Sequence, residues 1–272
     1  MAVPYFIGLL LLVGIPAIAG LQLAFTEFSG LAAPRFSGLD NFTALARDDL
    51  FWRSALNSLV YAAIAVPLRL VVAGGIALLL FRRSFGVPSA RAAAYLPSVI
   101  PDAAYALLWV WLLNPIYGPI AATGLWSGIL TDPGSTRLAI AFMGALQIGE
   151  AFVIALAARA AIPSQLYEAA AVDGARPWTA LTRITLPMMA PVLALLAMRD
   201  IVLSLQLNFV PAFIVTEGGP RFATTYLPLY VYRSAFSYFK LGYASAMSVV
   251  MFVFTAAVVY VQYRLARRWR LI

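Results

Sequence analysis

The chain contains no cysteine, no histidine and a single lysine, Lys240, among its 272 residues. The absence of cysteine excludes disulfides, thiolate catalysis and cysteine metal sites. The absence of histidine removes Ser-His and Cys-His nucleophile systems and most zinc sites, so we expect no metal site. No glycine-rich loop precedes Lys240, which rules out a phosphate-cradling GxxxxGK[ST] loop. If ATP drives this protein, another chain must bind it.

Charged residues are also scarce. They make up 11% of the chain, whereas 63% of the residues are hydrophobic and the mean hydropathy is +0.88. A soluble domain carries about 25% charged residues, and no soluble core of this size could bury such an apolar surplus. We therefore predict an integral membrane protein. The net charge of +8 does not indicate nucleic acid binding, because several basic residues lie beside apolar runs, where positive charge records orientation in the bilayer.

The apolar runs are long enough for six transmembrane helices, since a bilayer core of about 30 Å needs ~20 residues of helix. The sequence predicts an all-α, polytopic fold with one domain over residues 1–272. The expected spans are 4–25, 54–81, 92–113, 138–158, 188–215 and 242–263. Ala17-Ile18-Ala19 resembles a signal-peptidase site, but no basic segment precedes this run, so we expect a retained helix. Small residues spaced four apart between Gly242 and Ser248 predict close helix packing.

Six spans place both termini on one side of the membrane, and the arginine content indicates which side. The segments 82–91, 159–187 and 264–272 share that side and hold ten arginines in 48 residues. The opposite side holds seven basic residues in 77. The positive-inside rule therefore predicts that both termini are cytoplasmic. The ten arginines are Arg82, Arg83, Arg91, Arg159, Arg176, Arg183, Arg264, Arg267, Arg268 and Arg270.

One polar segment, residues 163–187, interrupts the apolar chain. It predicts a helix over "QLYEAAAV" and a break at Asp173-Gly174, because glycine tolerates the left-handed conformation at a helix end. A second helix is expected to begin at Pro177, which suits a first helical turn. Alanines keep the first helix slim. Such a helix can enter a groove in another protein or lie on lipid headgroups as an amphipathic connector, and these local features leave both interpretations open.

The residues Glu168, Ala169 and Ala170, followed by Gly174 and "ITLP", resemble the EAA signature of permease subunits in ABC importers. Over nearly its whole length the chain is similar to the maltose-type carbohydrate permease family, on the side of its first, F-like partner. Five further segments occur in the order expected for that family: "GLDNF" (38–42), "FWRSALNSLVY" (51–61), "LLNPIYG" (112–118), "TEGGP" (216–220) and "LGYASAMSV" (241–249).

The resemblance implies a type I ABC importer permease fold in the cytoplasmic (inner) membrane of a bacterium or archaeon. A second homologous permease would complete the path, and an external binding protein would deliver a sugar or related polyol. Two ABC ATPase subunits would bind ATP and magnesium, so this chain would be no enzyme and would bind no cofactor. The segment 163–187 would be the cytoplasmic coupling loop. Its ATPase-coupling residues would be Glu168, Ala169, Ala170, Asp173 and Gly174.

Polar side chains within the expected spans are candidates for the solute path, because a charge at the bilayer centre costs roughly 2.5–3.5 kcal/mol on insertion scales. Asp102 and Glu150 are expected near mid-depth, and Gln147 shares a helix face with Glu150. Pairing of Glu150 or Asp102 with Arg199 or Arg69, to fix helix packing, is the alternative. The residues expected to contact a hydroxyl-rich solute are Gln147, Glu150, Gln206, Asn208, Asp102, Tyr105 and Trp109.

Two other functions are compatible with individual residues. A stand-alone proton-coupled transporter would use Glu150 as its proton site, but that class usually shows internal repeats and needs more than six spans. An intramembrane aspartyl enzyme would need Asp102 to share a proton with Asp200 or Glu150. No GxGD-like sequence surrounds either aspartate.

Overall fold

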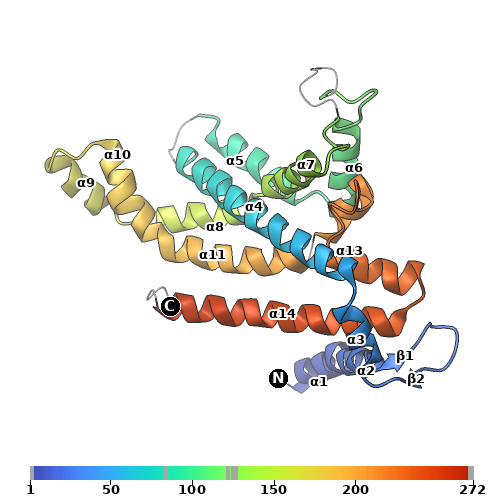
Figure 1. The fold of residues 1–272 in the computed structure, drawn as a ribbon. Helices are drawn as coiled ribbons and strands as arrows, with labels where there is room; N and C mark the ends of the chain where they lie inside the picture. The colour runs from blue at the N-terminus through green and yellow to red at the C-terminus, as the bar shows by residue number, and fades with distance from the viewer. Residues whose placement is uncertain (1–2, 82–84, 121–122, 124–127, 207, 269–272) are drawn as a thin grey trace.

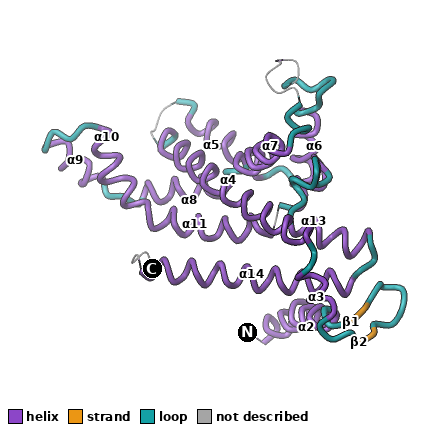
Figure 2. The backbone as a smooth tube through the Cα atoms, in the orientation of Figure 1, coloured by secondary structure: helices purple, strands orange, loops and turns teal. Residues whose placement is uncertain are grey.

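The computed structural model describes residues 3–81, 85–120, 123, 128–206 and 208–268, which are mainly helical (Figures 1 and 2). Three of the ten arginines counted above, Arg82, Arg83 and Arg270, lie outside the described residues. In the described part, the strands are β1 (Thr26–Glu27) and β2 (Arg35–Phe36), which form one short antiparallel pair. The prediction of a helical fold is confirmed, with this small hairpin as an addition.

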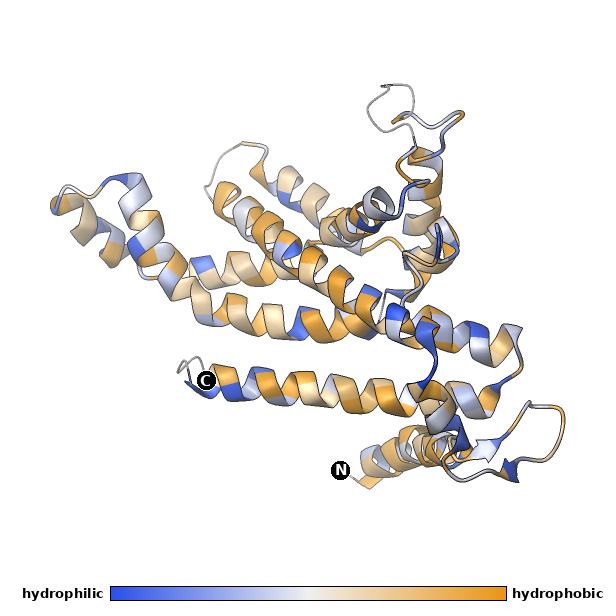
Figure 3. Cartoon of the chain, viewed as in Figure 1, coloured by the Kyte–Doolittle hydropathy of each residue, from blue (hydrophilic) through white to orange (hydrophobic). Residues whose placement is uncertain are grey.

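Four helical stretches in the described chain are long and apolar enough to cross a membrane as continuous spans. Apolar residues predominate along them, and hydrophilic residues lie near their ends and, more rarely, within them (Figure 3). Three of them contain internal proline, such as Pro16, Pro67 and Pro191, which transmembrane helices tolerate. The four are α1–η1–α2 (Val3–Leu9, Leu10–Gly14, Ile15–Leu23), α4 (Asp49–Leu79), α10–η4–α11 (Pro177–Ala180, Leu181–Thr185, Leu186–Gln206) and α14 (Leu241–Arg268).

The helices expected over 92–113 and 138–158 are each broken, which corrects the prediction of continuous helices there. The first becomes α5–η2 (Val87–Tyr95, Leu96–Ser98) and α6 (Asp102–Leu112), bent by 97°. The second becomes α7 (Pro133–Leu146) and α8 (Gly149–Ala160), bent by 52°. Proline at 97 and 101 explains the first break, because proline lacks an N–H and restricts the residue before it.

The fifth expected span, 188–215, also differs from the structure, because its helix ends at Gln206. The following residues form α12 (Phe209–Pro211) and η5 (Ala212–Thr216) as separate short turns. The end of the molecule that carries the β1–β2 pair is completed by α3 (Asp40–Ala46), α13 (Leu227–Tyr232) and η6 (Arg233–Ser237).

Helix α4 lies at the centre of the packing and contacts α7, α8 and α11. Helix α14 packs against α2, α3, α11 and α13, so it joins the N-terminal span to the rest of the bundle. The buried core beside α4 contains Tyr61, Trp109, Ile140 and Tyr226. The C-terminal end of α14 and the α9–α10 hairpin lie at the same end of the molecule (Figure 1).

The loop that contains "TEGGP" is held against α4 and α7. Asn57 donates from Nδ2 to the carbonyl oxygens of Phe222 (2.8 Å) and Thr225 (3.2 Å). Arg137 on α7 donates to Asn57 Oδ1 (3.0 Å) and to the carbonyl oxygen of Ala223 (3.1 Å). These two side chains satisfy carbonyl groups of irregular backbone, which would otherwise be left without partners when buried.

Gly242, at the start of α14, is packed against the backbone of the β1 segment. A Cβ atom added there would meet the carbonyl group of Thr26, and the Gly242 N–H already donates to Phe28 O (3.1 Å). We expect Gly242→Ala to lower the free energy of unfolding by about 1–3 kcal/mol, because backbone cannot move aside cheaply. Thermal unfolding in detergent measures this change.

The matched control for that variant is Gly74→Ala in α4, where no atom lies within 4 Å of the added Cβ. We expect this control to be neutral or to stabilise the protein by up to about 1 kcal/mol, because alanine favours helix. Equal destabilisation by the two substitutions would contradict close packing at Gly242.

Asp48 joins three elements at the end of the molecule that carries the hairpin. Its carboxylate caps α4 by accepting from the N–H groups of Leu50 (2.9 Å) and Phe51 (3.2 Å), and it accepts the hydroxyls of Tyr230 (2.6 Å) and Tyr243 (2.5 Å). Partial burial raises the pKa of Asp48, but the four hydrogen bonds outweigh this effect and hold the pKa below its ordinary value.

A lowered pKa in the folded state means that Asp48 stabilises the protein above the unfolded pKa of about 4, and that this stabilisation is lost as the pH falls through the folded value. We expect Asp48→Asn to cost about 1 kcal/mol between pH 6 and 7 and progressively less below about pH 4. Unfolding curves at several pH values test this, with the exposed neighbour in Asp49→Asn as control. A pH-independent difference would contradict the role of the Asp48 charge.

Candidate functional site

A polar cavity of about 220 Å³ lies where the two broken helices meet α4 and α11. The breaks contribute Ser98 and Asp102 from one pair of helices and Gln147 and Glu150 from the other. Its full lining is Tyr61, Arg69, Ser98, Asp102, Tyr105, Gln147, Glu150, Leu203, Ser204, Asn208 and Pro211. The cavity therefore unites five of the seven residues predicted for the solute path: Asp102, Tyr105, Gln147, Glu150 and Asn208.

Hydrogen bonds across the cavity join the two broken helices. Gln147 donates from Nε2 to Asp102 Oδ1 (3.2 Å), and the N–H of Gly149 donates to Ser98 Oγ (2.8 Å). Asp102 was expected ten residues into a continuous span, but it is the first residue of α6, directly after the bend. The bend brings Asp102 to Gln147, and the pattern of apolar residues alone does not predict it.

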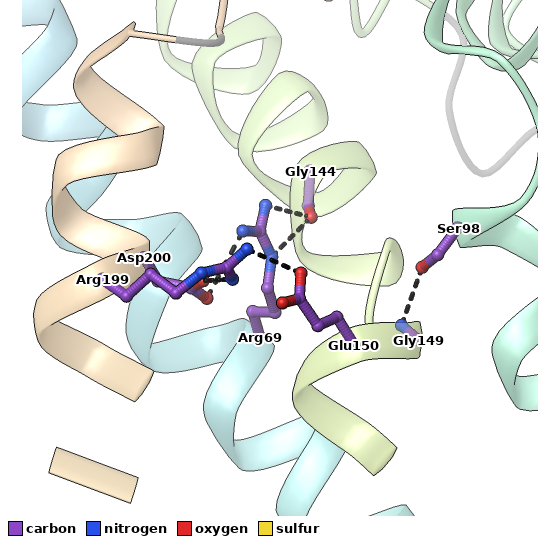
Figure 4. Close-up of polar contacts among 7 residues, drawn as sticks. All are labelled: Arg69, Ser98, Gly144, Gly149, Glu150, Arg199 and Asp200. Atoms are coloured by element: carbon purple, nitrogen blue, oxygen red, sulfur yellow. Dashed lines mark hydrogen bonds and ion pairs between the residues drawn. The ribbon is translucent and has the colours of Figure 1, made fainter. Parts of the chain in front are cut away.

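A network of ion pairs among Arg69, Arg199, Glu150 and Asp200 lies beside the cavity (Figure 4). Arg69 binds Asp200 (3.4 Å) and donates to the carbonyl oxygen of Gly144 (2.6 and 3.0 Å). Arg199 binds Glu150 (2.7 Å) and lies 3.7 Å from Asp200. The packing alternative is thus realised for Glu150, which also lines the cavity. Because Asp200 and Glu150 each bind arginine and not another carboxylate, the arrangement needed for an aspartyl protease is not formed by these groups.

Two buried side chains of the cavity have unused hydrogen-bonding groups. Asn208 is 2% exposed, and neither its Oδ1 nor its Nδ2 has a partner among the described residues. Ser204 Oγ, 5% exposed as a residue, is likewise without a partner there. A buried amide without a partner is costly, so both groups suit a bound ligand or water that supplies donors and acceptors.

The structure does not bring the remaining two predicted residues into the cavity. Trp109 is buried in the apolar core and packs against Tyr105 and Phe142. Gln206 is exposed and lines an apolar hollow beside α14. Conversely, Tyr61, Ser98 and Ser204 line the cavity but were not predicted, because small or aromatic side chains in apolar runs give no signal of their own.

The predicted coupling segment forms the helix α9 (Ser164–Val172), and none of its residues is buried. It ends where Gly174 takes a left-handed conformation (φ 72°) and Ala175 N–H donates to Ala170 O (2.8 Å). Pro177 then begins α10, as expected from the sequence. Glu168, Ala169 and Asp173 are exposed, and the hairpin projects from the bundle (Figure 1).

The base of this hairpin is fixed by Tyr167 and Arg159. The Arg159 guanidinium stacks on the rings of Phe81 (4.2 Å), two residues after α4, and of Tyr167 (4.4 Å) in α9. The Tyr167 hydroxyl shares a hydrogen bond with Thr185 Oγ1 (2.8 Å) in η4. These contacts tie α9 to α4, α8 and α11, the helices that form the cavity.

Comparison with protein families matches residues 65–271 to the binding-protein-dependent transport system inner membrane component family. The chain belongs to this family. The permease is 35% identical to the probable ABC transporter permease protein YesP of Bacillus subtilis, over 98% of this chain and 89% of that relative. It is 30% identical to AmyD of Thermoanaerobacterium thermosulfurigenes, a probable starch degradation products transport system permease, over 97% and 92% of the two chains.

Solved structures confirm the ABC importer fold of the permease. A chain of a bacterial alginate ABC transporter, in complex with a periplasmic protein bound to alginate pentasaccharide, matches with a TM-score of 0.85 and 26% identity, covering 98% of this chain and 93% of that one. A chain of the MetNI methionine ABC transporter matches with a TM-score of 0.58 at 18% identity, over 80% and 95% of the chains, and shares the fold alone.

Proposed function

We propose that this permease and a second homologous permease form the transmembrane path of an ABC importer for a sugar or related polyol. An external binding protein delivers the solute. Two ATPase subunits bind ATP and magnesium and drive alternating access, and one of them docks on α9. Helix α9 and both termini face the cytoplasm, as the arginine distribution indicates.

The observation that carries this proposal is the coupling hairpin. Helix α9 is slim, buries none of its nine residues and presents Glu168 to solvent. A surface helix of a monomeric domain normally buries an apolar face, so a helix without one is suited to docking elsewhere. Its base is tied to the cavity helices through Arg159 and Tyr167, so a displacement of α9 reaches the cavity.

The cavity supports a hydroxyl-rich solute, because it pairs neutral hydrogen-bonding groups with an aromatic wall. Asn208 and Ser204 offer unused donors and acceptors, and Tyr61 and Tyr105 supply rings. A relative named for starch degradation products agrees with this class of solute.

Reconstitution in vesicles tests the proposal. We expect ATP-dependent uptake only when this chain, its partner permease, the ATPase subunits and the binding protein are present together. Vesicles that lack either the ATPase or the second permease serve as controls. Uptake by this chain alone, driven by a proton gradient, would instead support a proton-coupled carrier and refute the proposal.

A further inference from the structure

The two helix breaks direct two helix N-termini at the cavity. Helices α6 and α8 both begin there, since Asp102 and Glu150 lie in their first turns and line the cavity. A helix N-terminus carries a partial positive charge and free N–H groups, and broken helices of transporters use such ends to bind anionic parts of a substrate. Taken by itself, this backbone geometry would favour an anionic solute.

In this chain each of those ends carries its own carboxylate. Asp102 is the first residue of α6, and Glu150 is the second residue of α8. The N–H of Gly149, the first residue of α8, already donates to Ser98 Oγ. The positive ends of both helices are therefore complemented by acidic side chains from the chain itself, at the place where an anionic group of a solute would bind.

The neighbouring cations are also engaged. Among the described residues that line the cavity, Arg69 is the cation, and it binds Asp200 and the carbonyl oxygen of Gly144. Arg199, which lies beside the cavity, binds Glu150. The lining thus contains two carboxylates and one cation, which is already paired with a carboxylate. Its side chains without a hydrogen-bond partner, Asn208 and Ser204, are neutral.

We infer that Asp102 and Glu150 are specificity-determining residues that make this cavity reject anionic solutes and accept uncharged, hydroxyl-rich ones. This inference rests on the proposed function and narrows its solute class. It separates this permease from relatives that are named for sn-glycerol-3-phosphate and sulfoquinovosyl glycerol, a phosphate and a sulfonate, and from the importer of the acidic polysaccharide alginate. The charge of the cavity can be measured without knowing the solute.

The absence of native cysteine allows that measurement, because an introduced cysteine is the only thiol in the chain. Leu203→Cys places a thiol in the cavity without removing a polar group, since Leu203 lines the cavity and is partly exposed. In the full complex, its rates of reaction with cationic, anionic and neutral methanethiosulfonates are compared with those of free cysteine. Leu39→Cys, on the exposed surface, is the control.

The measured quantity is the ratio of the reaction rate with the cationic reagent to that with the anionic reagent. We expect this ratio to be roughly tenfold higher at Leu203→Cys than at free cysteine, which is equivalent to about 1.4 kcal/mol. Adding Asp102→Asn or Glu150→Gln, which keep the shape of each side chain, should reduce this preference. A ratio equal to that of free cysteine overturns the inference. The inference is also overturned if the neutral reagent labels neither Leu203→Cys nor Pro211→Cys, a second position in the cavity lining, because a sealed cavity admits no solute.

Transport distinguishes failure of this inference from failure of the proposed function. ATP-dependent uptake of sn-glycerol 3-phosphate or of an alginate oligosaccharide by the wild-type complex would overturn the solute class and leave the importer function intact. Absence of any ATP-dependent uptake would count against the importer function, whereas the labelling ratio would still report the charge of the cavity.

Discussion

Replacing Asp200 by alanine is expected to lower the free energy of unfolding by about 3–5 kcal/mol, because it leaves the largely buried side chain of Arg69 without its counter-charge. The Asp200 side chain is 3% exposed and that of its partner, Arg69, is 15% exposed, so water can replace little of the lost interaction. The yield of folded protein from membranes and its thermal unfolding in detergent measure the effect.

The matched control is Glu150→Ala, which breaks the second ion pair. The side chains of Arg199 and Glu150 are 44% and 59% exposed, so we expect this change to cost less than about 1 kcal/mol. The double variant Arg69→Met with Asp200→Leu removes both charges and should recover part of the stability lost in Asp200→Ala. If Asp200→Ala and Glu150→Ala are equally mild, Asp200 does not hold a buried charge pair.

Reversing the charge on the coupling helix, by Glu168→Arg, is expected to weaken binding of the ATPase by roughly 2–4 kcal/mol, or at least about thirtyfold in Kd. The reason is that α9 presents an exposed carboxylate to its proposed docking site, and a reversed charge meets repulsion there. Because none of α9 is buried, the spans should fold as in the wild type. Co-purification of the ATPase and ATP-dependent uptake provide the measurements.

Glu27→Arg makes the same charge reversal on the exposed β1 strand, at the opposite end of the molecule, and should leave ATPase binding unchanged. If Glu168→Arg binds the ATPase and transports as the wild type does, Glu168 is not part of the docking surface. Loss of folded protein in Glu168→Arg would show instead that α9 is needed for the fold of the permease itself.

Local sequence signals predicted the structure of the α9–α10 hairpin well. The helix over "QLYEAAAV", the break at Gly174 and the restart at Pro177 are each set by residues within a few positions, so propensity and turn chemistry are sufficient. The long apolar spans were predicted for a related reason, since the length of an apolar run is itself a local property.

The cavity was predicted only in part, because it depends on contacts between distant residues. Asp102, Glu150 and Arg69 could be identified as charged residues within apolar runs, but the sequence does not indicate which residue each of them contacts. Arg69 binds Asp200, 131 positions away, and the 97° bend before α6 turns Asp102 toward Gln147. Trp109 and Gln206 lie outside the cavity, and the sequence could not indicate this, since the direction of a side chain depends on how its helix packs.

Helix α8 has Arg159 near one end and Glu150 near the other, nine residues or about 14 Å apart along its axis. The first contacts the coupling helix through Tyr167, and the second binds Arg199 at the cavity. An α-helix transmits axial movement with little compression, so the two ends cannot shift independently. If an ATPase docks on α9 as proposed, a substitution at Glu150 that changes the solute preference would also act on that docking surface, and a change at the docking surface would act on the cavity.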